Sequence, residues 1–464
     1  MAGFRTTNNA AARGRAVAWL RALTRAGNHP IVRKLYGMIP LRWKDALRAR
    51  LVMRATGAAV LQPVLPLAGS AAGPGVPVLR SPAPDNGPGV NLIGFAHGGL
   101  GLSENFRGLG RALLAQGYPV ALVDAGVLDD ARNKDRPTDL LLADSCPFAI
   151  DVVCINPDQF GRAMAATQAA RRADAYRIGY WFWELERVPA AWMSAIDDVD
   201  EIWVASEFVR GAFAAVTAKP VTLVRMPVQP PVLPAVVKGD ADPFVFMFSF
   251  DFHSYVARKN PSAVIEAFRR AFPNGDESVR LILKSNNGDA FRDQLYALMG
   301  AATDDARIEI RDGYIDRDDM IDLLARADAY VSLHRSEGFG LGMAEAMALG
   351  KAVVGTGYSG NLEFMRDDNS RLVRYELVAT PEGAYMHDEG GHWAEPDIDD
   401  AARIMRGLAD DRANAASMGL RAAAHMRAAH SLKVAGSIAM QRLEGIRVSR
   451  ALPVNVTPSK GVTP

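Results

Sequence analysis

Short apolar runs alternate with longer amphipathic stretches from Val90 onward, and the runs fall into two series. Each run is rich in Val, Ile, Leu or Phe and nearly continuous in its hydrophobicity, which is typical of strands buried on both faces of a parallel sheet. The first series comprises residues 90–96, 118–124, 148–156, 177–183, 201–206 and 221–226. The second comprises residues 244–250, 279–285, 307–312, 329–334, 351–356 and 371–375. Strands that alternate with helices in this way predict parallel α/β sheets.

Start and stop signals for helices lie between these runs. Ser103 can cap a helix whose apolar stripe includes Phe106 and Leu109, and Gly117 lies where a C-terminal glycine is expected. In the second series, Asp316 can cap another helix. Helices between consecutive strands are what a doubly wound sheet requires.

The proline-rich stretch 227–243 interrupts the alternation and is the best domain boundary in the chain. We expect an N-terminal domain over 90–230, a C-terminal domain over 244–397, and C-terminal helices over 398–447 that can pack back across the cleft. The economical architecture is therefore α/β, with two doubly wound, Rossmann-like domains that face a cleft. Ligands of such sheets bind beyond the carboxyl ends of the strands, so we expect the functional site in that cleft.

The formal net charge of +1 conceals two regions of opposite sign. Residues 1–54 hold twelve Lys or Arg against one acid, a formal charge of +11, and the other residues hold 41 bases and 51 acids, a formal charge of −10. The pattern over 15–25 predicts a helix with one apolar and one basic face, which either binds an anionic membrane surface or packs on the body of the protein. A nucleic-acid arm is disfavoured because the rest of the chain is acidic. With the Pro/Gly-rich linker that follows, residues 1–89 form a basic N-terminal extension.

Cysteine content and the first residues bear on the compartment. The chain has two cysteines, Cys146 and Cys154, as expected of a reducing compartment. The stretch MAGFRTTNNAAARGR has no apolar core and no cleavage site of a secretory signal, so we expect a cytoplasmic protein, peripheral at the inner membrane face if residues 1–54 bind lipid.

The stretch SEGFGLGMAEAMALGKAVVGTGYSGN, residues 336–361, carries the most informative chemistry. It follows a predicted strand, so its glycines form a strand-to-helix turn, and a helix that starts near Gly340 presents free amides to an anion. Glu337 lies in the turn and Glu345 lies inside the helix, and carboxylates accept hydrogen bonds from vicinal hydroxyls. Amides for phosphate and carboxylates for hydroxyls predict a nucleotide-sugar site. The alternative is a tight loop followed by a solvated Glu345.

This stretch resembles the group 1 glycosyltransferases, retaining enzymes with the two-domain GT-B fold. The resemblance covers residues 244–375 and rests on the Glu-x7-Glu spacing, the EGFGL string, the GKAVVGT strand and the GYSGN loop. It implies that Glu337 contacts hydroxyls of the donor sugar and that Glu345 holds the nucleotide ribose. The further donor-binding residues that it implies are Gly338, Phe339, Gly340, Leu341 and, in the adjoining loop, Asn361.

A basic pair precedes a helix in FSFDFHSYVARKNP, residues 248–261. This string resembles the family's basic pair, which stabilises the departing phosphate. Lys259 matches that pair and Arg258 substitutes for its earlier member. Lys284 ends the next strand and would point at the same cleft, with a solvent-exposed lysine as the alternative. With these cations, no metal or other cofactor is expected.

The N-terminal domain resembles the same family more loosely through HGGLGLSENFRGLGRAL, residues 97–113. Gly98, Gly99 and Gly101 would let the backbone approach the donor, although the family's Gly-x-Gly-Glu is replaced by Gly-Leu-Ser-Glu. His97, at a strand end, and Glu184, after the aromatic run GYWFW, are candidates for contact with the acceptor. The tryptophans of that run are more typical of a core.

Together these features predict a retaining hexosyltransferase that uses a nucleotide-diphosphate sugar. Its acceptor would be the hydroxyl of a saccharide or of a lipid-linked molecule, and the resemblance points to bacterial polysaccharide or glycolipid assembly. A phosphorylase or epimerase on the same fold, or a catalytically silent scaffold that binds nucleotide sugars, are the alternatives.

Overall fold

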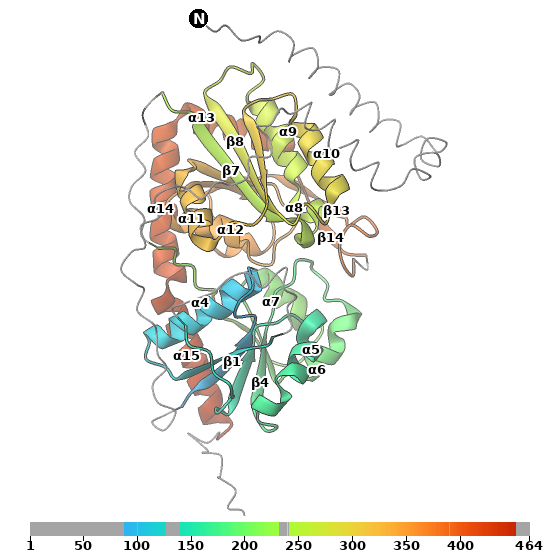
Figure 1. Cartoon of the computed structure of the whole chain (residues 1–464), viewed down its shortest axis with the longest axis vertical. Coiled ribbons are helices and arrows are strands. Elements are labelled where there is room, and N and C mark those ends of the chain that lie inside the picture. Colours follow the sequence, from blue (N-terminus) through green and yellow to red (C-terminus); the bar gives the residue numbers. More distant parts are fainter. Residues whose placement is uncertain are drawn as a thin grey trace, which may run out of the picture.

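The computed structural model describes residues 88–99, 101–126, 140–231, 239, 241–388 and 390–451. The expected basic segment 1–54 lies outside the described residues, as does nearly all of the linker that follows it. The described residues build two parallel sheets, which lie one above the other in Figure 1.

The first sheet has six parallel strands in the order β2-β1-β3-β4-β5-β6. Its elements are β1 (Val90–Gly94), α4 (Gly101–Ala115), β2 (Val120–Asp124), β3 (Ile150–Val153), α5 (Pro157–Ala166), β4 (Tyr176–Tyr180), α6 (Met193–Asp197), β5 (Glu201–Val204), α7 (Glu207–Ala214) and β6 (Val221–Leu223). All residues of β1, β3 and β5 are buried, because helices cover both faces of the sheet.

The second sheet also has six parallel strands, in the order β12-β11-β10-β7-β8-β9. Its elements are β7 (Phe244–Asp251), α8 (Val256–Lys259), α9 (Pro261–Ala271), β8 (Val279–Asn286), α10 (Arg292–Ala302), β9 (Ile308–Asp312), α11 (Arg317–Arg326), β10 (Ala329–Ser332), α12 (Leu341–Ala348), β11 (Ala352–Thr356) and β12 (Arg371–Val373). After it come an antiparallel hairpin, β13 (Tyr375–Ala379) and β14 (His392–Pro396), and the helices α13 (Ile398–Asp410), α14 (Arg412–His430) and α15 (Leu432–Ser449).

The predicted fold class, two doubly wound α/β domains, is confirmed. Each predicted strand is present, but several end earlier than the apolar run does. The run 177–183, for example, leaves the sheet at Tyr180, and Trp181 and Trp183 continue it as a buried loop with 0% and 1% exposure. The apolar run is longer than the strand because these rings fill a core beyond the sheet edge.

One helix begins earlier than its sequence signal predicts. Helix α4 starts at Gly101, so Ser103 lies inside its first turn rather than at its cap, and the buried Ser103 hydroxyl has no hydrogen-bond partner among the described residues. The other two signals are correct. Gly117 has a φ of 71°, and the Asp316 side chain accepts from the Asp319 amide at 2.8 Å at the start of α11.

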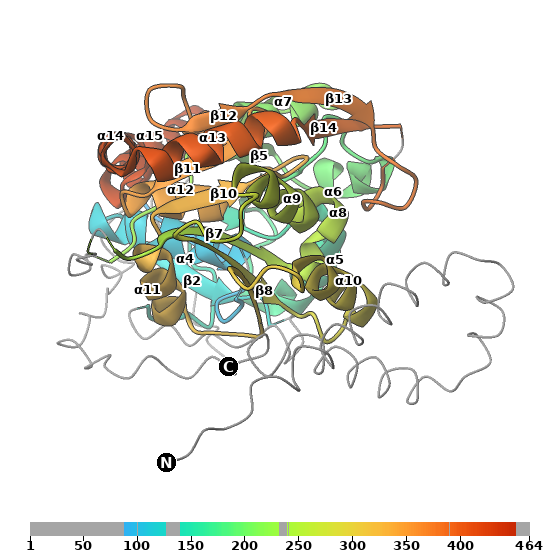
Figure 2. The same cartoon turned by 90° about the horizontal axis from the view of Figure 1, so that it is seen from above.

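The last two helices connect the two sheets. Helix α14 packs beside α12 and β11, and α15 packs on α4 of the N-terminal domain. Arg442 of α15 makes two hydrogen bonds, of 2.8 and 2.6 Å, to the buried carboxylate of Glu201 on β5. Figures 1 and 2 place α14 and α15 on one side of the molecule and the hairpin β13–β14 on the opposite side. Within the described part of the chain, no helix has the length and hydropathy to cross a membrane.

Candidate active site

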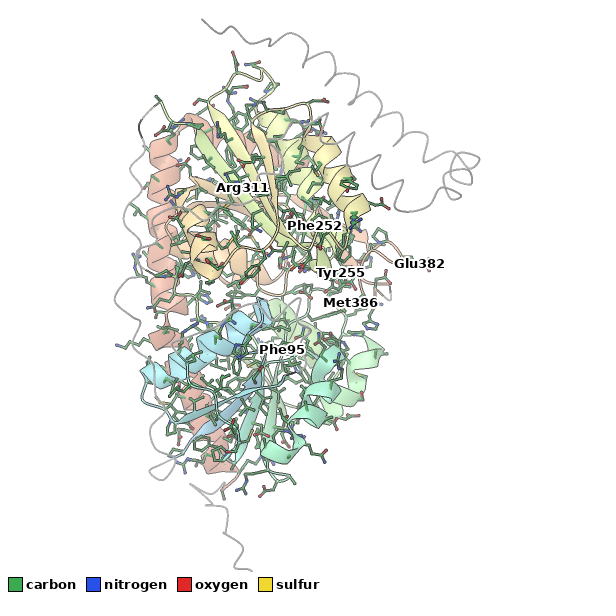
Figure 3. The ribbon with its side chains drawn as sticks, in the orientation of Figure 1. Phe95, Phe252, Tyr255, Arg311, Glu382 and Met386 are labelled. Atoms are coloured by element: carbon green, nitrogen blue, oxygen red, sulfur yellow. The ribbon has the colours of Figure 1, made fainter. Side chains whose placement is uncertain are left out.

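A cavity of about 470 Å³ lies between the two sheets, beyond the carboxyl ends of their strands. The second sheet contributes Ser249, Asp251, Lys284 and Asn286 from the ends of β7 and β8, together with the turn that precedes α12. The first sheet contributes the ends of β3 and β4 and the start of α4. Tyr255 and Met386, labelled in Figure 3, lie in the region between the sheets. The site is therefore placed where open α/β sheets bind their ligands.

Four charged side chains form one cluster in this cavity. Lys259 donates to Oε1 of Glu337 at 2.5 Å, and Arg258 Nη1 lies 3.3 Å from Oε2 of the same carboxylate. Arg258 Nη2 lies 3.6 Å from Oε1 of Glu184, which comes from the first sheet. Burial raises the pKa of Glu337, but the charges of Lys259 and Arg258 outweigh it and lower the pKa to about 2. Glu337 is thus an anion at every physiological pH, whereas burial lowers the pKa of Lys259 and the charge of Glu337 opposes this.

The basic pair is carried by α8, a single turn bracketed by unusual backbone. Tyr255 before it has a φ of 63° and Asn260 after it a φ of 54°, values that non-glycine residues adopt rarely. These two bends turn Arg258 inward, where its Nη1 donates to the Ser336 carbonyl at 2.8 Å. The proline after Asn260 starts α9 and ends the short helix there.

The glycine-rich turn before α12 is held from both domains. Gly340 has a φ of 94° and is the N-cap of α12. The Glu337 amide donates to the Ser359 hydroxyl, and the Gly360 amide donates to the Glu337 carbonyl, each at 2.8 Å. From the first sheet, the Ser206 hydroxyl donates to the Gly338 carbonyl at 2.7 Å. The expected donor-binding residues Gly338, Phe339, Gly340 and Leu341 all line the cavity.

Gly360 is a position where any side chain must displace this turn. A Cβ there would lie 2.1 Å from the Gly338 carbonyl oxygen and 2.7 Å from that of Glu337. We expect Gly360→Ala to lower stability by about 2 kcal/mol, and hence the Tm by roughly 5 °C, since both obstacles are backbone atoms. Thermal melting measures this, with Gly407→Ala as control, because a Cβ at Gly407 of α13 meets nothing within 4 Å. Equal Tm values for the two variants would contradict this account of the turn.

Glu345 also lines the cavity and joins the two domains through an arginine. Its Oε1 lies 2.5 Å from Nη2 of Arg317, whose Nε lies 3.7 Å from Oε1 of Glu104 on α4. Burial raises the pKa of Glu345, and the charge of Arg317 opposes this. Glu337 and Glu345 thus line the same cavity.

Lys284 lines the cavity, but its ammonium group is held by the protein. Nζ donates to the Ser285 carbonyl at 2.7 Å, to Oδ1 of Asn286 at 2.8 Å and to the Gly313 carbonyl. Burial lowers its pKa to about 8, although Asp312 and Asp251 oppose this. Lys284 therefore lies at the cleft, where it was expected. The alternative of a solvent-exposed lysine is wrong, since only 2% of the residue is accessible.

Four predicted site residues are not among those that line the cavity: His97, Gly98, Gly99 and Asn361. Asn361 lies behind the glycine-rich turn, where its Nδ2 donates to the Thr356 carbonyl at 2.9 Å and its Oδ1 lies 3.1 Å from Nε2 of His334. The Gly98 carbonyl accepts from the buried Arg107 at 2.9 Å, which fixes that loop against α4. Of the predicted glycines of this loop, Gly101 reaches the cavity.

Several cavity residues had no sequence signal. Asp158 lies at the start of α5, and Tyr385 and Met386 lie in the loop of the β13–β14 hairpin. Most residues of β13 are exposed and show no alternation of apolar and polar residues. Hydrophobic periodicity therefore does not predict this hairpin. Among the described residues, no three His, Cys, Asp or Glu side chains gather in a way that could hold a metal ion.

Comparison with known proteins agrees with this geometry. Residues 248–376 match the family model described as glycosyl transferases group 1. None of the curated proteins matches the chain in sequence. Among solved structures, Anabaena HepE in complex with UDP and glucose is 13% identical, with a TM-score of 0.53 over 77% of this chain and 99% of that one.

Two further structures show the same architecture. Sucrose-phosphate synthase from Thermosynechococcus elongatus is 15% identical, with a TM-score of 0.57 over 78% of this chain and 100% of that one. A glycosyltransferase from Rickettsia africae is 13% identical, with a TM-score of 0.54 over 78% of this chain and 99% of that one. The chain therefore has the two-domain GT-B fold, and residues 248–376 of its C-terminal domain match the model of the group 1 glycosyl transferases.

Proposed function

We propose that the protein is a retaining glycosyltransferase that moves a hexose from a nucleotide-diphosphate sugar to an acceptor hydroxyl. The observation that carries this proposal is the meeting of Glu337, Lys259 and Arg258 beside the first amides of α12, on the wall of one cavity. Cations and helix amides suit a diphosphate, and a carboxylate among them suits the hydroxyls of a sugar.

The transfer step that we propose uses this arrangement. The bond between the anomeric carbon and the diphosphate oxygen breaks, and its electron pair leaves with the diphosphate. Lys259, Arg258 and the amides near Gly340 stabilise the charge that develops on that oxygen. The acceptor oxygen forms its bond to the anomeric carbon from the same face, and its proton passes to the departing phosphate oxygen. The anomeric configuration is thereby retained without a protein base.

The donor is expected to be a UDP-sugar, because HepE, which shares the fold, was solved with UDP and glucose. A panel of nucleotide sugars tests this by thermal shift. We expect one donor to raise the Tm of the wild type. In Glu345→Gln most of this rise in Tm should be lost, because Glu345 would hold the ribose. No shift with any nucleotide sugar would contradict the proposal.

The same panel separates the other chemistries of this fold. Donor consumption that requires inorganic phosphate would indicate a phosphorylase, and conversion of the donor to its epimer would indicate an epimerase. Donor binding without turnover in the presence of many acceptors would indicate a silent scaffold. We expect sugar transfer that depends on an acceptor and is independent of added phosphate.

Lys284 is proposed to add its positive charge to the donor site. With a pKa of about 8, it is an ammonium ion below that pH and a neutral amine above it. Attraction for the diphosphate is therefore present at pH 7 and lost as the pH rises through about 8. We expect the donor Kd to rise roughly tenfold between pH 7 and pH 9.5, and a flat profile for Lys284→Met. Calorimetric titration measures both; parallel profiles would contradict the role of Lys284.

The acceptor is proposed to belong to polysaccharide or glycolipid assembly, with the basic segment 1–54 holding the enzyme at an anionic membrane. Each basic residue near such a surface contributes about 1 kcal/mol. Deletion of residues 1–54 should then abolish binding to vesicles that contain anionic lipid. Unchanged binding would remove this part of the proposal.

A further inference from the structure

A second group of cavity residues was given no contact with the donor above, although Glu184 of this group pairs with Arg258. It consists of Asp158 and Glu184 from the N-terminal domain and Tyr255, Tyr385 and Met386 from the C-terminal domain, which we call the opposite wall. Tyr255 and Met386 mark its place between the two sheets in Figure 3. Since the two domains supply it together, the opposite wall exists only while they face each other as they do here.

The aromatic part of the opposite wall is rigidly supported. Tyr385 donates to Oε2 of Glu184 at 2.6 Å, and its ring centroid lies 4.9 Å from that of Tyr255 and 5.5 Å from that of Trp183. The Arg258 guanidinium lies 5.6 Å from the centroid of the same ring. The Tyr255 backbone has a φ of 63°, a strained value that persists because its surroundings enforce it. Such fixed aromatic rings can pack against the C–H face of a sugar ring.

The polar part of the opposite wall retains bonding capacity. Oε1 of Glu184 lies 3.6 Å from the nearest arginine nitrogen, which is beyond hydrogen-bond distance. Asp158 is exposed at the cavity, at the start of α5. Trp192, which is 2% exposed, also lines the cavity, and its indole N–H has no hydrogen-bond partner among the described residues. These groups suit a ligand with several hydroxyls, each able both to donate and to accept.

The charge of the opposite wall is negative. It carries two carboxylates, and the arginine beside it is already 3.3 Å from Glu337. Burial raises the pKa of Asp158, the charge of Glu184 adds to this, and His387 opposes it. A further anion placed here would therefore meet like charges in a partly desolvated site, which costs several kcal/mol in protein complexes.

We propose that the opposite wall is the acceptor subsite and that it selects an uncharged sugar ring over a phosphorylated or uronic acid acceptor. This inference rests on the proposed transferase function and narrows its acceptor class. Sugar hydroxyls donate to Asp158 and Glu184, and the ring packs against Tyr255 and Tyr385. A phosphate or carboxylate on the acceptor is repelled by the two acids.

The test measures binding to protein saturated with UDP, by calorimetry. The probes are octyl glucoside, galactoside, mannoside and N-acetylglucosaminide, and then the 6-phosphate and the uronate of whichever sugar binds best. We expect the uncharged glycoside to bind at least tenfold more tightly than either anionic form. In Asp158→Asn the ratio of the affinities for the uncharged and the anionic glycoside should fall to about threefold or less, because one repelling charge is gone. Asp174→Asn, at an exposed turn where Asp174 pairs with Arg172, should keep the wild-type ratio.

Each outcome bears on a different claim. Anionic probes that bind as tightly as the uncharged one, an unchanged ratio in Asp158→Asn, or no binding of any probe would overturn the acceptor subsite. Tight binding of an uncharged glycoside without transfer from any nucleotide sugar would instead contradict the proposed function and leave the selectivity of the subsite in place. Preferential transfer to an anionic acceptor would support the proposed function and contradict the selectivity of the subsite.

Discussion

Replacing Glu337 with glutamine is expected to lower kcat on the order of 10²–10³-fold. The carboxylate lies between Lys259 and Arg258, with contacts of 2.5 and 3.3 Å, and only 6% of the residue is accessible. Glutamine has nearly the same shape but no charge, so it neither positions the two cations nor accepts as strongly from sugar hydroxyls. Transfer kinetics with the donor found by the panel measure the effect.

Stability must be measured beside activity for this variant. Breaking a buried ion pair costs about 3–5 kcal/mol when one charge is left alone. Here Arg258 still pairs with another carboxylate, that of Glu184. Glu309→Gln is the control, because Glu309 pairs with Arg311 at 2.7 Å on β9, away from the cavity, and should leave kcat within twofold. A Glu337→Gln protein that is folded and retains the wild-type kcat would refute the assignment.

Replacing Lys259 with methionine is expected to lower kcat by a similar factor, on the order of 10²-fold or more, with a smaller effect on KM. Methionine fills the space of the lysine stem but cannot stabilise the charge on the departing diphosphate. Lys259→Arg should recover part of the loss because it restores a cation at that place. Steady-state kinetics of the three proteins measure the series.

The leaving group provides the specific control for Lys259. A glycosyl fluoride of the same sugar is tested with the acceptor and added nucleoside diphosphate: the sugar passes to the acceptor oxygen, fluoride leaves, and no new charge develops on a phosphate. Lys259→Met should therefore lose much less activity with the fluoride than with the nucleotide sugar. Equal losses with both donors would mean that Lys259 acts on something other than the departing diphosphate.

The fold was predictable because its signals are local. A buried parallel strand shows as a continuous apolar run, and the runs 244–250 and 279–285 became β7 and β8 with ends that differ by one residue. The turn before α12 was predictable for the same reason, since strand, glycines and helix are adjacent in sequence. Ser103 shows the limit of such signals: α4 starts two residues earlier, at Gly101, so the serine lies inside the helix and not at its cap.

The cavity was only half predictable because it is assembled across the chain. Ser206 reaches Gly338 over 132 positions and Tyr385 reaches Glu184 over 201, and no periodicity encodes contacts of this kind. For a related reason, two glycines that were predicted to approach the donor do not line the cavity. Gly98 and Gly99 suit a loop that approaches a ligand, but here the Gly98 carbonyl accepts from Arg107, which fixes the loop against α4.

The stereochemistry of the product tests the central claim most directly. Wild-type enzyme, the nucleotide sugar selected by the panel and its acceptor are followed by proton NMR from the first turnover. We predict that the new glycosidic bond has the same anomeric configuration as the donor and that it fails to form with Glu337→Gln. A product of inverted configuration, or release of free sugar without transfer, would contradict the mechanism built on Glu337, Lys259 and Arg258.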